Sequence, residues 1–533
     1  METTVTNQAL ESALRGRTRI RVMGLTFDDV VRFFFAGNAT AAMVVLALIL
    51  VFLSKEGVGF FAQNHANLTV YRKAGLEYVD LMRQPMEQFT AVTRSLNDVR
   101  LARFQKLLAS GKGVEGANEA LAGFDAFAGQ FGAAVGSARG LVSDLTDAAS
   151  EIKTKAQVNG DREEQRRLLL REGKREEADA VKIEVIDFGR EVKALTGTIP
   201  AWKAAAGEAA AKVNAAVALA EGADWGRGDR ELARAVGEAR AFVGELGRVG
   251  GRLEAWRWDE PVPFWKSFAA FVFGREWLTA SFWQDWYGIL PLLAGSVLVS
   301  VIAMLLAVPF ALAAAVYISE VATPREKAFI KPYIEFLSAI PSVVLGFFGV
   351  AVLGTKLREL SEVSWLQWIP GFPMSERLNA LTAACLLALI SIPTIFSLAE
   401  DALTNVPKHF KEASFALGAT RLQTLVRVLI PASLSGMISA VLLGFGRVIG
   451  ETMVVLLCAG NRIAIPDFTQ GLGALFQPVH TMTGIIAQEM GEVPNGTIHY
   501  RALFMVGIVL FLIALGINYV AQRVVRRYRI SIG

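Results

Sequence analysis

The apolar stretch SLSGMISAVLLGFGRVIGETMVVLLCA, residues 433–459, decides the fold class of this chain of 533 residues. Its part from 435 to 459 is long enough to cross a bilayer core, which takes roughly 20 residues in a helix. Arg447 lies at the centre of this part, and Glu451 follows four positions later. An arginine at that depth costs roughly 2.5–3.5 kcal/mol on translocon scales, and such residues usually face a cavity or a partner. The stretch therefore predicts a membrane protein with a polar site inside it.

The composition of the whole chain also favours a membrane protein. Hydrophobic residues make up 53% of the sequence, and the mean hydropathy is +0.40. Soluble chains of this size are rarely so apolar. The net charge of only +4 gives no reason to expect a nucleic-acid partner. Cys385 and Cys458 both fall in apolar runs, so we expect packing thiols rather than a disulfide.

Six segments are apolar and long enough to be transmembrane helices. An even number places both termini on one side, and clusters of Lys and Arg before, between and after the spans put that side in the cytoplasm. The N-terminus lacks the pattern of a cleavable signal peptide, and we expect it to stay attached. The six predicted spans are 33–53, 290–318, 329–353, 380–398, 435–459 and 502–519.

The region between the first two spans is predicted to be an external helical insert. Apolar residues alternate steps of three and four along 124–152, 178–202 and 232–256, and more loosely along 82–108. Such seams indicate long helices packed at shallow angles, as in a coiled coil. Breaks at 111–116, 159–164 and 221–229 predict about four helices in antiparallel hairpins over 54–262. The tryptophan-rich segment 263–289 that follows is typical of a membrane interface.

A cytoplasmic segment after the fourth span, KHFKEASFALGATRLQTLVRVLIPASL (408–434), carries a docking pattern. The spacing of Glu412-Ala413-Ser414, Gly418 and Pro431 resembles the EAA loop of ABC importer permeases, here residues 408–431. A short amphipathic helix can lay its apolar side in a partner's groove, and Gly418 permits a turn that alanine would resist. An ordinary interfacial helix is the alternative. The sequence contains no G-x-x-x-x-G-K-[ST] motif, so we expect ATP hydrolysis in a separate subunit rather than in this chain.

Several segments together resemble PstC, one of the two membrane subunits of the phosphate-specific ABC importer. They are FVFGREWLTASFWQDWYGILPLLAGSVLVS (271–300), SAIPSVVLGFFG (338–349), the EAA loop and GFGRVIGETMVVLLCAGN (444–461). The resemblance covers roughly residues 30–60 and 265–530, and the long insert departs from it.

The resemblance implies an all-α polytopic membrane protein with a type I ABC importer permease core over 290–524 and cytoplasmic segments at 1–32 and 525–533. The implied location is the cell inner membrane, in contact with membrane lipid. The implied partners are a PstA-like permease subunit, a PstB-like ATPase and a PstS-like phosphate-binding protein, and no cofactor is implied.

Arg447 and Glu451 are the central candidates for the substrate path. In a continuous helix they would share one face and could pair. We hypothesise that Arg447 binds phosphate through bidentate hydrogen bonds, which its planar fork suits. Glu451 would neutralise the arginine in the empty path, or accept the proton of HPO₄²⁻, which sulfate lacks. The resemblance gives both residues a transport role, and the alternative is an ion pair that only locks helices together.

Five further residues complete the candidate site. Thr452 belongs to the same motif, and Ser338 and Ser342 flank a proline where they could donate to an anion or to their own backbone. Gly446 and Gly450 form a GxxxG pattern that predicts close approach of another helix. The four histidines are scattered without metal-ligand spacing, so no metal site is predicted.

Two other functions fit parts of the sequence. A permease for sulfate, molybdate or tungstate would look similar in its core and EAA loop. A membrane sensor could carry long external helices, although four further spans and the EAA loop argue against it. The role of the insert stays open among docking a phosphate-binding protein, binding an outer-envelope component and bracing the complex.

Overall fold

The computed structural model describes residues 21–22, 25–222, 230–279, 281, 284–366 and 368–528. It contains two compact units: unit 1 comprises Met1–Phe60 with Pro291–Gly533, and unit 2 comprises Phe61–Leu290. Most of the predicted N-terminal segment 1–32 lies outside the described residues. The same holds for 223–229 of the predicted break at 221–229, for parts of the predicted tryptophan-rich segment, and for 529–533 of the predicted tail.

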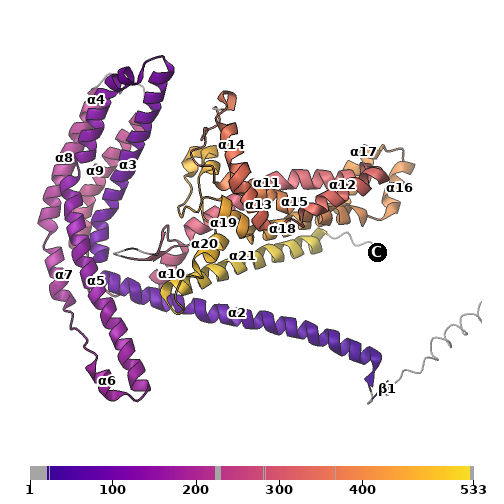
Figure 1. The fold of residues 1–533 in the computed structure, drawn as a ribbon, viewed down its shortest axis with the longest axis horizontal. Helices are drawn as coiled ribbons and strands as arrows, with labels where there is room; N and C mark the ends of the chain where they lie inside the picture. The colour runs from indigo at the N-terminus through magenta and orange to yellow at the C-terminus, as the bar shows by residue number, and fades with distance from the viewer. Residues whose placement is uncertain are drawn as a thin grey trace, which may run out of the picture. The chain divides into compact units, whose positions relative to one another are not determined.

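Unit 1 consists mainly of helices (Figure 1), several of which are long and apolar. Its secondary structure is β1 Arg21–Val22, β2 Leu25–Thr26, α2 Phe27–Lys73 (continuing into unit 2), α11 Leu290–Val316, η2 Tyr317–Val321, α12 Pro324–Leu337, α13 Ser342–Phe348, η3 Gly349–Leu353, α14 Gly354–Ser361, η4 Ser364–Leu366, α15 Ala380–Thr404, α16 Lys408–Ala416, α17 Arg421–Thr424, η5 Leu425–Leu429, α18 Ile430–Ile449, α19 Met453–Cys458, η6 Phe468–Phe476, α20 Met482–Glu489 and α21 Ile498–Tyr528.

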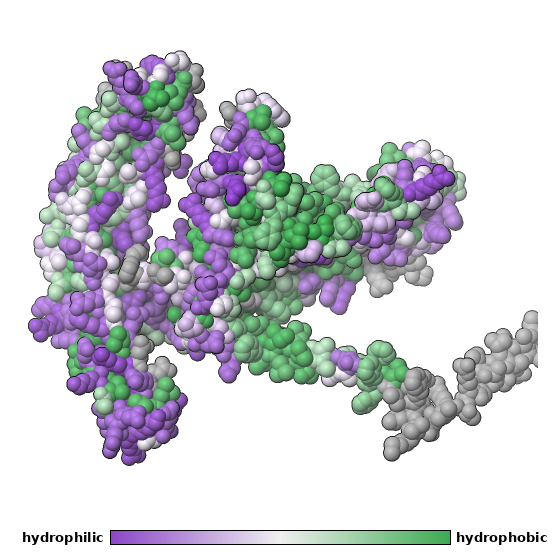
Figure 2. Space-filling model, viewed as in Figure 1, coloured by the Kyte–Doolittle hydropathy of each residue, from purple (hydrophilic) through white to green (hydrophobic). Residues whose placement is uncertain are grey.

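Five helices in the described part of the chain are long and apolar enough to cross a membrane, and a bent helix pair makes up to six. The predicted six-helix membrane architecture is therefore confirmed at the level of composition and length. Figure 2 shows hydrophobic residues gathered over the surface of these spans. The five helices are Val31–Lys73, Leu290–Val321, Ala380–Thr404, Arg421–Ile449 and Ile498–Arg527.

The third predicted span, 329–353, is not one straight helix. Pro324–Leu337 and Ser342–Ser361 meet at an angle of 86°. Pro341 lies at the bend and adopts an extended conformation, with φ −60° and ψ 135°. Because proline lacks an N–H and its ring clashes with the preceding helical turn, α12 ends before it and α13 starts after it.

Helix α15 forms the centre of unit 1 and packs closely against α18. A Cβ atom added to Gly436 would lie 2.5 Å from Ala402 Cβ, and one added to Gly444 would lie 2.5 Å from Ile395 Cγ1. Ala440 lies between these two glycines and is buried. Small residues at every fourth position allow the two helix axes to approach closely.

Unit 2 is a bundle of long helices that pack side by side (Figure 1). Phe89 and Phe131 stack in its core with ring centroids 4.6 Å apart. Its elements are α3 Leu76–Ala109, α4 Val114–Ala133, α5 Gly136–Arg171, α6 Arg175–Ala180, α7 Phe188–Thr196, α8 Ile199–Gly222, α9 Arg230–Ala255, α10 Trp265–Val272, β3 Trp277–Leu278 and β4 Trp286–Tyr287. Strands β3 and β4 pair antiparallel, with Trp277 opposite Tyr287.

Three expectations for the insert are wrong in detail. The predicted break at 159–164 lies inside α5, whereas the seam 124–152 is interrupted at residues 134–135. The seam 178–202 is divided among α6, an extended segment at 181–187, α7 and α8. Asn159 explains the first error, because its amide exchanges hydrogen bonds with the backbone of Glu184 in the extended segment, at 2.6 and 3.0 Å. The polar residues therefore serve a tertiary contact and not a turn.

Candidate functional site

The fifth predicted span, 435–459, is interrupted next to its central arginine. Helix α18 ends at Ile449, Gly450 caps it, and α19 starts at Met453, so Glu451 and Thr452 lie outside both helices. The backbone at the break has partners elsewhere, as an interrupted membrane helix requires. The carbonyl of Glu451 accepts a hydrogen bond from Thr483 Oγ1 at 2.8 Å. The expected continuous helix is therefore wrong at this point.

Arg447 is held by α15 and not by Glu451. Its Nη1 donates a hydrogen bond to Thr394 Oγ1 at 2.8 Å, and its side chain is exposed. Arg447 and Glu451 form no ion pair in the described structure, because α18 ends between them. The predicted direct pairing of Arg447 with Glu451 is therefore absent from the described structure, and Arg447 instead links α18 to α15. A guanidinium carries five N–H donors, so most of its donors face away from Thr394.

Thr394 is the residue that sequence reasoning missed. It follows Pro393 in the middle of an apolar helix, and that polar residue beside a proline was the only local signal. Glu451 and Thr452 are both partly buried at the break. Thr452 Oγ1 has only a long contact of 3.5 Å to the carbonyl of Gly450. The break thus places two polar side chains near the end of the helix that carries Arg447.

The predicted GxxxG pattern, Gly446 and Gly450, does not lie at a close contact between helices. A Cβ atom added to Gly446 would lie 3.8 Å from Ile517 of α21, which is an ordinary van der Waals distance. One added to Gly450 would meet only backbone oxygens of its own helix, at 3.7 Å. The close approaches of α18 occur instead at the glycines that face α15.

The bend in the third span packs against the second half of the fifth. A Cβ atom added to Gly346 of α13 would lie 2.5 Å from Leu457, and one added to Gly349 would lie 2.4 Å from Cys458 Sγ. Cys458 Sγ also donates a hydrogen bond to the carbonyl of Gly346 at 3.3 Å, so α13 packs directly against α19, the second half of the interrupted span.

Ser338 and Ser342 differ in their bonding. Ser338 Oγ donates to the carbonyl of Glu335 at 2.6 Å, so it satisfies its own helix end, and its side chain is exposed. Ser342 is partly buried at the first position of α13. Of the two predicted serines, only Ser342 lies on the helix that packs against the interrupted fifth span.

The EAA loop forms two short helices joined by a tight turn. Helix α16 ends at Ala416, and Gly418 adopts a left-handed conformation with φ +80°. Thr420 then caps α17 through a capping box with Gln423. Pro431 lies in the first turn of α18, directly after the π-helical turn η5, so its missing N–H falls where the helical hydrogen-bond pattern changes. Gly418 therefore occupies a position that favours glycine.

The EAA loop exposes both its motif and a set of apolar side chains. Glu412 and Ala413 are exposed, and Ser414 Oγ lies 2.9 Å from Thr424 Oγ1, which joins α16 to α17. Leu417 is 89% exposed and Leu422 is 68% exposed. A cavity of about 420 Å³ lies beside the loop. It is lined by Glu320, Val321, Lys411, Phe415, Arg421, Leu422, Thr424, Leu425 and Leu429.

Ion pairs connect the region of the EAA loop to the bent third span. Glu400 of α15 is buried, and its oxygens lie 3.2 Å from Lys327 Nζ and 2.8 Å from Lys331 Nζ of α12. Lys411 of α16 pairs with Glu320 of η2. Sequence reasoning did not identify these pairs, because the partners lie far apart in the chain.

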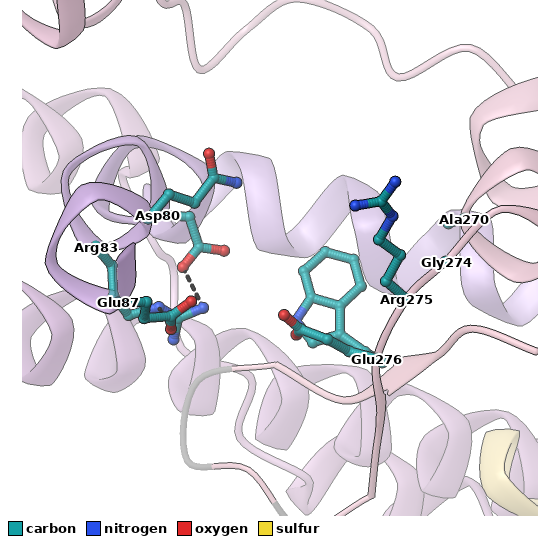
Figure 3. Close-up of a pocket in the computed structure, with 9 residues that line it drawn as sticks. Asp80, Arg83, Glu87, Ala270, Gly274, Arg275 and Glu276 are labelled. Atoms are coloured by element: carbon teal, nitrogen blue, oxygen red, sulfur yellow. Dashed lines mark ion pairs between the residues drawn. The ribbon is translucent and has the colours of Figure 1, made fainter. Parts of the chain in front are cut away.

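Unit 2 contains a charged cleft of about 220 Å³ (Figure 3). Asp80, Arg83 and Glu87 project from α3 on one side, and Arg275 and Glu276 lie on the other. Arg83 pairs with Asp80 at 2.5 Å and with Glu87 at 3.3 Å. Burial, reinforced by the nearby carboxylates Glu87 and Glu276, raises the pKa of Asp80 to about 7 even though Arg83 opposes the shift.

Comparison with known proteins places the sequence of this chain in a family. Residues 307–530 match the model of the binding-protein-dependent transport system inner membrane component. The chain is 35% identical over 258 residues to "Probable ABC transporter permease protein YqgH" of Bacillus subtilis, covering 46% of this chain and 78% of that protein. It is 30% identical over 293 residues to "Phosphate transport system permease protein PstC" of Mesorhizobium japonicum, covering 53% of this chain and 85% of that protein. A structure of the inward-facing MetNI methionine ABC transporter aligns at 18% identity over 45% of this chain and 94% of that one, with a TM-score of 0.33.

Proposed function

The chain belongs to the PstC-type family of ABC importer permeases, as its motifs predicted, and we propose that it moves inorganic phosphate across the cell inner membrane. The observation that carries this proposal is Arg447, an exposed guanidinium at an interrupted membrane span, in a chain that resembles a PstC protein over most of that protein's length. Phosphate is a multivalent anion, and arginine binds it bidentately.

The interrupted helices add to the case for an anion. Helix α19 begins directly after Thr452, and α13, which begins at Ser342, packs against α19. Helix N-termini carry partial positive charge, and discontinuous membrane helices commonly direct such ends at anionic substrates. We infer that Arg447 supplies the charged contact and that Thr452 and Ser342 supply neutral donors.

Because Glu451 does not pair with Arg447, we assign its carboxylate a role in binding the substrate. Its side chain lies at the break without contacting Arg447, so it leaves the guanidinium available to substrate. We propose that its carboxylate accepts a hydrogen bond from the P–OH group of HPO₄²⁻, a contact that sulfate, which carries no proton, cannot make. This assignment predicts discrimination between the two anions at one carboxylate.

ATP hydrolysis is proposed to reside in a separate PstB-like subunit that docks on the EAA loop. The exposed apolar side chains Phe415, Leu417 and Leu422 offer the surface that such docking requires. A PstA-like permease subunit and a PstS-like binding protein complete the proposed importer. Both termini are proposed to be cytoplasmic and the helical insert external, because the charged loops of unit 1 follow the positive-inside rule.

Competition experiments test the substrate. Cells that express this chain with its partner subunits, and no other phosphate importer, are given radiolabelled phosphate with an excess of unlabelled sulfate, molybdate or tungstate. The proposal expects uptake to be inhibited by unlabelled phosphate and by arsenate, a close analogue, but not by the other three anions. Strong inhibition by sulfate or molybdate would reassign the permease to that oxyanion.

A further inference from the structure

The buried carboxylate of Glu400 connects α15, the helix that leads into the EAA loop, to α12 of the bent third span. A transport cycle has to coordinate these two regions. Glu400 lies near the C-terminal end of α15, which leads directly into α16 of the EAA loop. Both of its partners, Lys327 and Lys331, come from α12, at 3.2 and 2.8 Å. They are four residues apart and therefore share one face of that helix. Two attachment points restrict the rotation of α12 as well as its position.

A second ion pair connects α16, the first helix of the EAA loop, to η2, the turn that precedes α12. Lys411 of α16 pairs with Glu320 of η2, which ends two residues before Thr323. Thr323 caps α12 through a capping box with Glu326. The segment from η2 to α12 is thus held by α15 just before the EAA loop and by α16 within it. A displacement of α16 larger than the reach of these lysine side chains either moves α12 with it or separates one of these pairs.

The far end of α12 leads to the candidate substrate path. It ends at the 86° bend, and α13 after the bend packs against α19. Cys458 Sγ of α19 donates a hydrogen bond to the carbonyl of Gly346 in α13 at 3.3 Å. Helix α19 begins immediately after Glu451 and Thr452. A continuous set of packed helices therefore runs from the EAA loop to the break beside Arg447.

We propose that Glu400 is a positioning residue for transport, which fixes α12 to α15 so that movement of the EAA loop reaches the interrupted fifth span. The inference rests on the proposed function, because it assumes that an ATPase moves the loop. Leaving a buried carboxylate unpaired is expensive, so α12 follows Glu400 rather than detaching from it. The pair then acts as a link that transmits position and does not contact the substrate.

The test measures coupling instead of activity alone. The importer is assembled from wild-type or variant chain with its partner subunits in proteoliposomes, and phosphate transported and ATP hydrolysed are measured in the same sample. In Glu400→Gln we expect ATP hydrolysis to continue and the ATP consumed per phosphate to rise by about fivefold or more, as loss of a coupling interaction implies. A ratio equal to wild type would overturn the proposal, even if both rates fell.

Matched variants separate coupling from folding. Glu359→Gln removes an exposed ion pair with Lys356 on α14, at 2.7 Å, and should leave the ratio unchanged. The exchange Glu400→Lys with both Lys327→Glu and Lys331→Glu restores opposite charges at both contacts and should lower the ratio toward wild type. If Glu400→Gln does not assemble, Lys327→Gln and Lys331→Gln each remove one attachment, and wild-type ratios in both would overturn the proposal.

The outcome distinguishes this inference from the proposed function. If the wild-type importer transports another oxyanion instead of phosphate, the proposed substrate is wrong and the ratio is measured with that ion. The role of Glu400 is then tested by comparing the ratio of ATP consumed to ion transported in Glu400→Gln with the ratio in Glu359→Gln.

Discussion

Replacing Thr394 with valine removes one hydroxyl from α15 and leaves the side-chain volume nearly unchanged. That hydroxyl accepts the hydrogen bond from Arg447 Nη1 at 2.8 Å. A hydrogen bond that involves a charged group contributes about 1.5–3 kcal/mol, and the exposure of Arg447 favours the lower end. A change of about 1.4 kcal/mol is tenfold in an equilibrium constant. We therefore expect Thr394→Val to raise the KM for phosphate about tenfold, because the guanidinium loses its fixed orientation.

Initial rates of phosphate uptake over a range of concentrations measure this effect. The maximal rate should change little, since the lost bond orients the arginine equally in the bound complex and in the transition state. Thr394→Ser keeps the hydroxyl and serves as the control, and both variants are checked for equal amounts in the membrane. A wild-type KM in Thr394→Val at equal expression would refute the claim that Thr394 orients Arg447.

Three further predictions address the EAA loop, unit 2 and the helix contacts. Gly418→Ala places an alanine at φ +80°, which costs about 1–2 kcal/mol, and should reduce copurification of the ATPase subunit; unchanged copurification would contradict a docking role for this turn. Asp80 has a pKa raised to about 7, so its ionisation destabilises the fold above pH 7, and this cost disappears as the pH falls toward 4. Asp80→Asn should therefore stabilise the fold by at most about 4 kcal/mol at pH 8 and by about 1.5 kcal/mol at pH 5, which is measured as a larger rise in Tm at pH 8, and an equal effect at both pH values would contradict the assignment. Gly444→Leu should lower the Tm through overpacking of about 1–3 kcal/mol or more against Ile395, whereas Gly516→Ala, which faces open space, should not.

The membrane spans could be predicted from the sequence because a bilayer imposes length and hydrophobicity on every crossing helix. The turn at Gly418 was predictable for an equally local reason, since few residues other than glycine adopt its backbone conformation. The resemblance of the GRVIGET motif to a family then identified Arg447 as the residue to examine.

The interruptions of the spans could not be predicted from hydrophobicity. At the break, residues 450–452, the carbonyl of Glu451 accepts a hydrogen bond from Thr483, which lies in another segment, and hydrophobicity along the chain does not reveal such a partner. Proline was a local signal at residue 341, but its presence alone does not give an angle, since Pro309 and Pro393 lie within helices. The contact of Arg447 with Thr394 also depends on how α15 and α18 pack.

The measurement that tests the central claim most directly is phosphate uptake by cells that carry Arg447→Ala, with the amount of variant in the membrane determined alongside. The account predicts that uptake is lost while the protein remains inserted at the wild-type level, because the guanidinium at the interrupted span binds the anion in transit. Wild-type uptake at equal expression would contradict it and place the substrate path elsewhere in the permease.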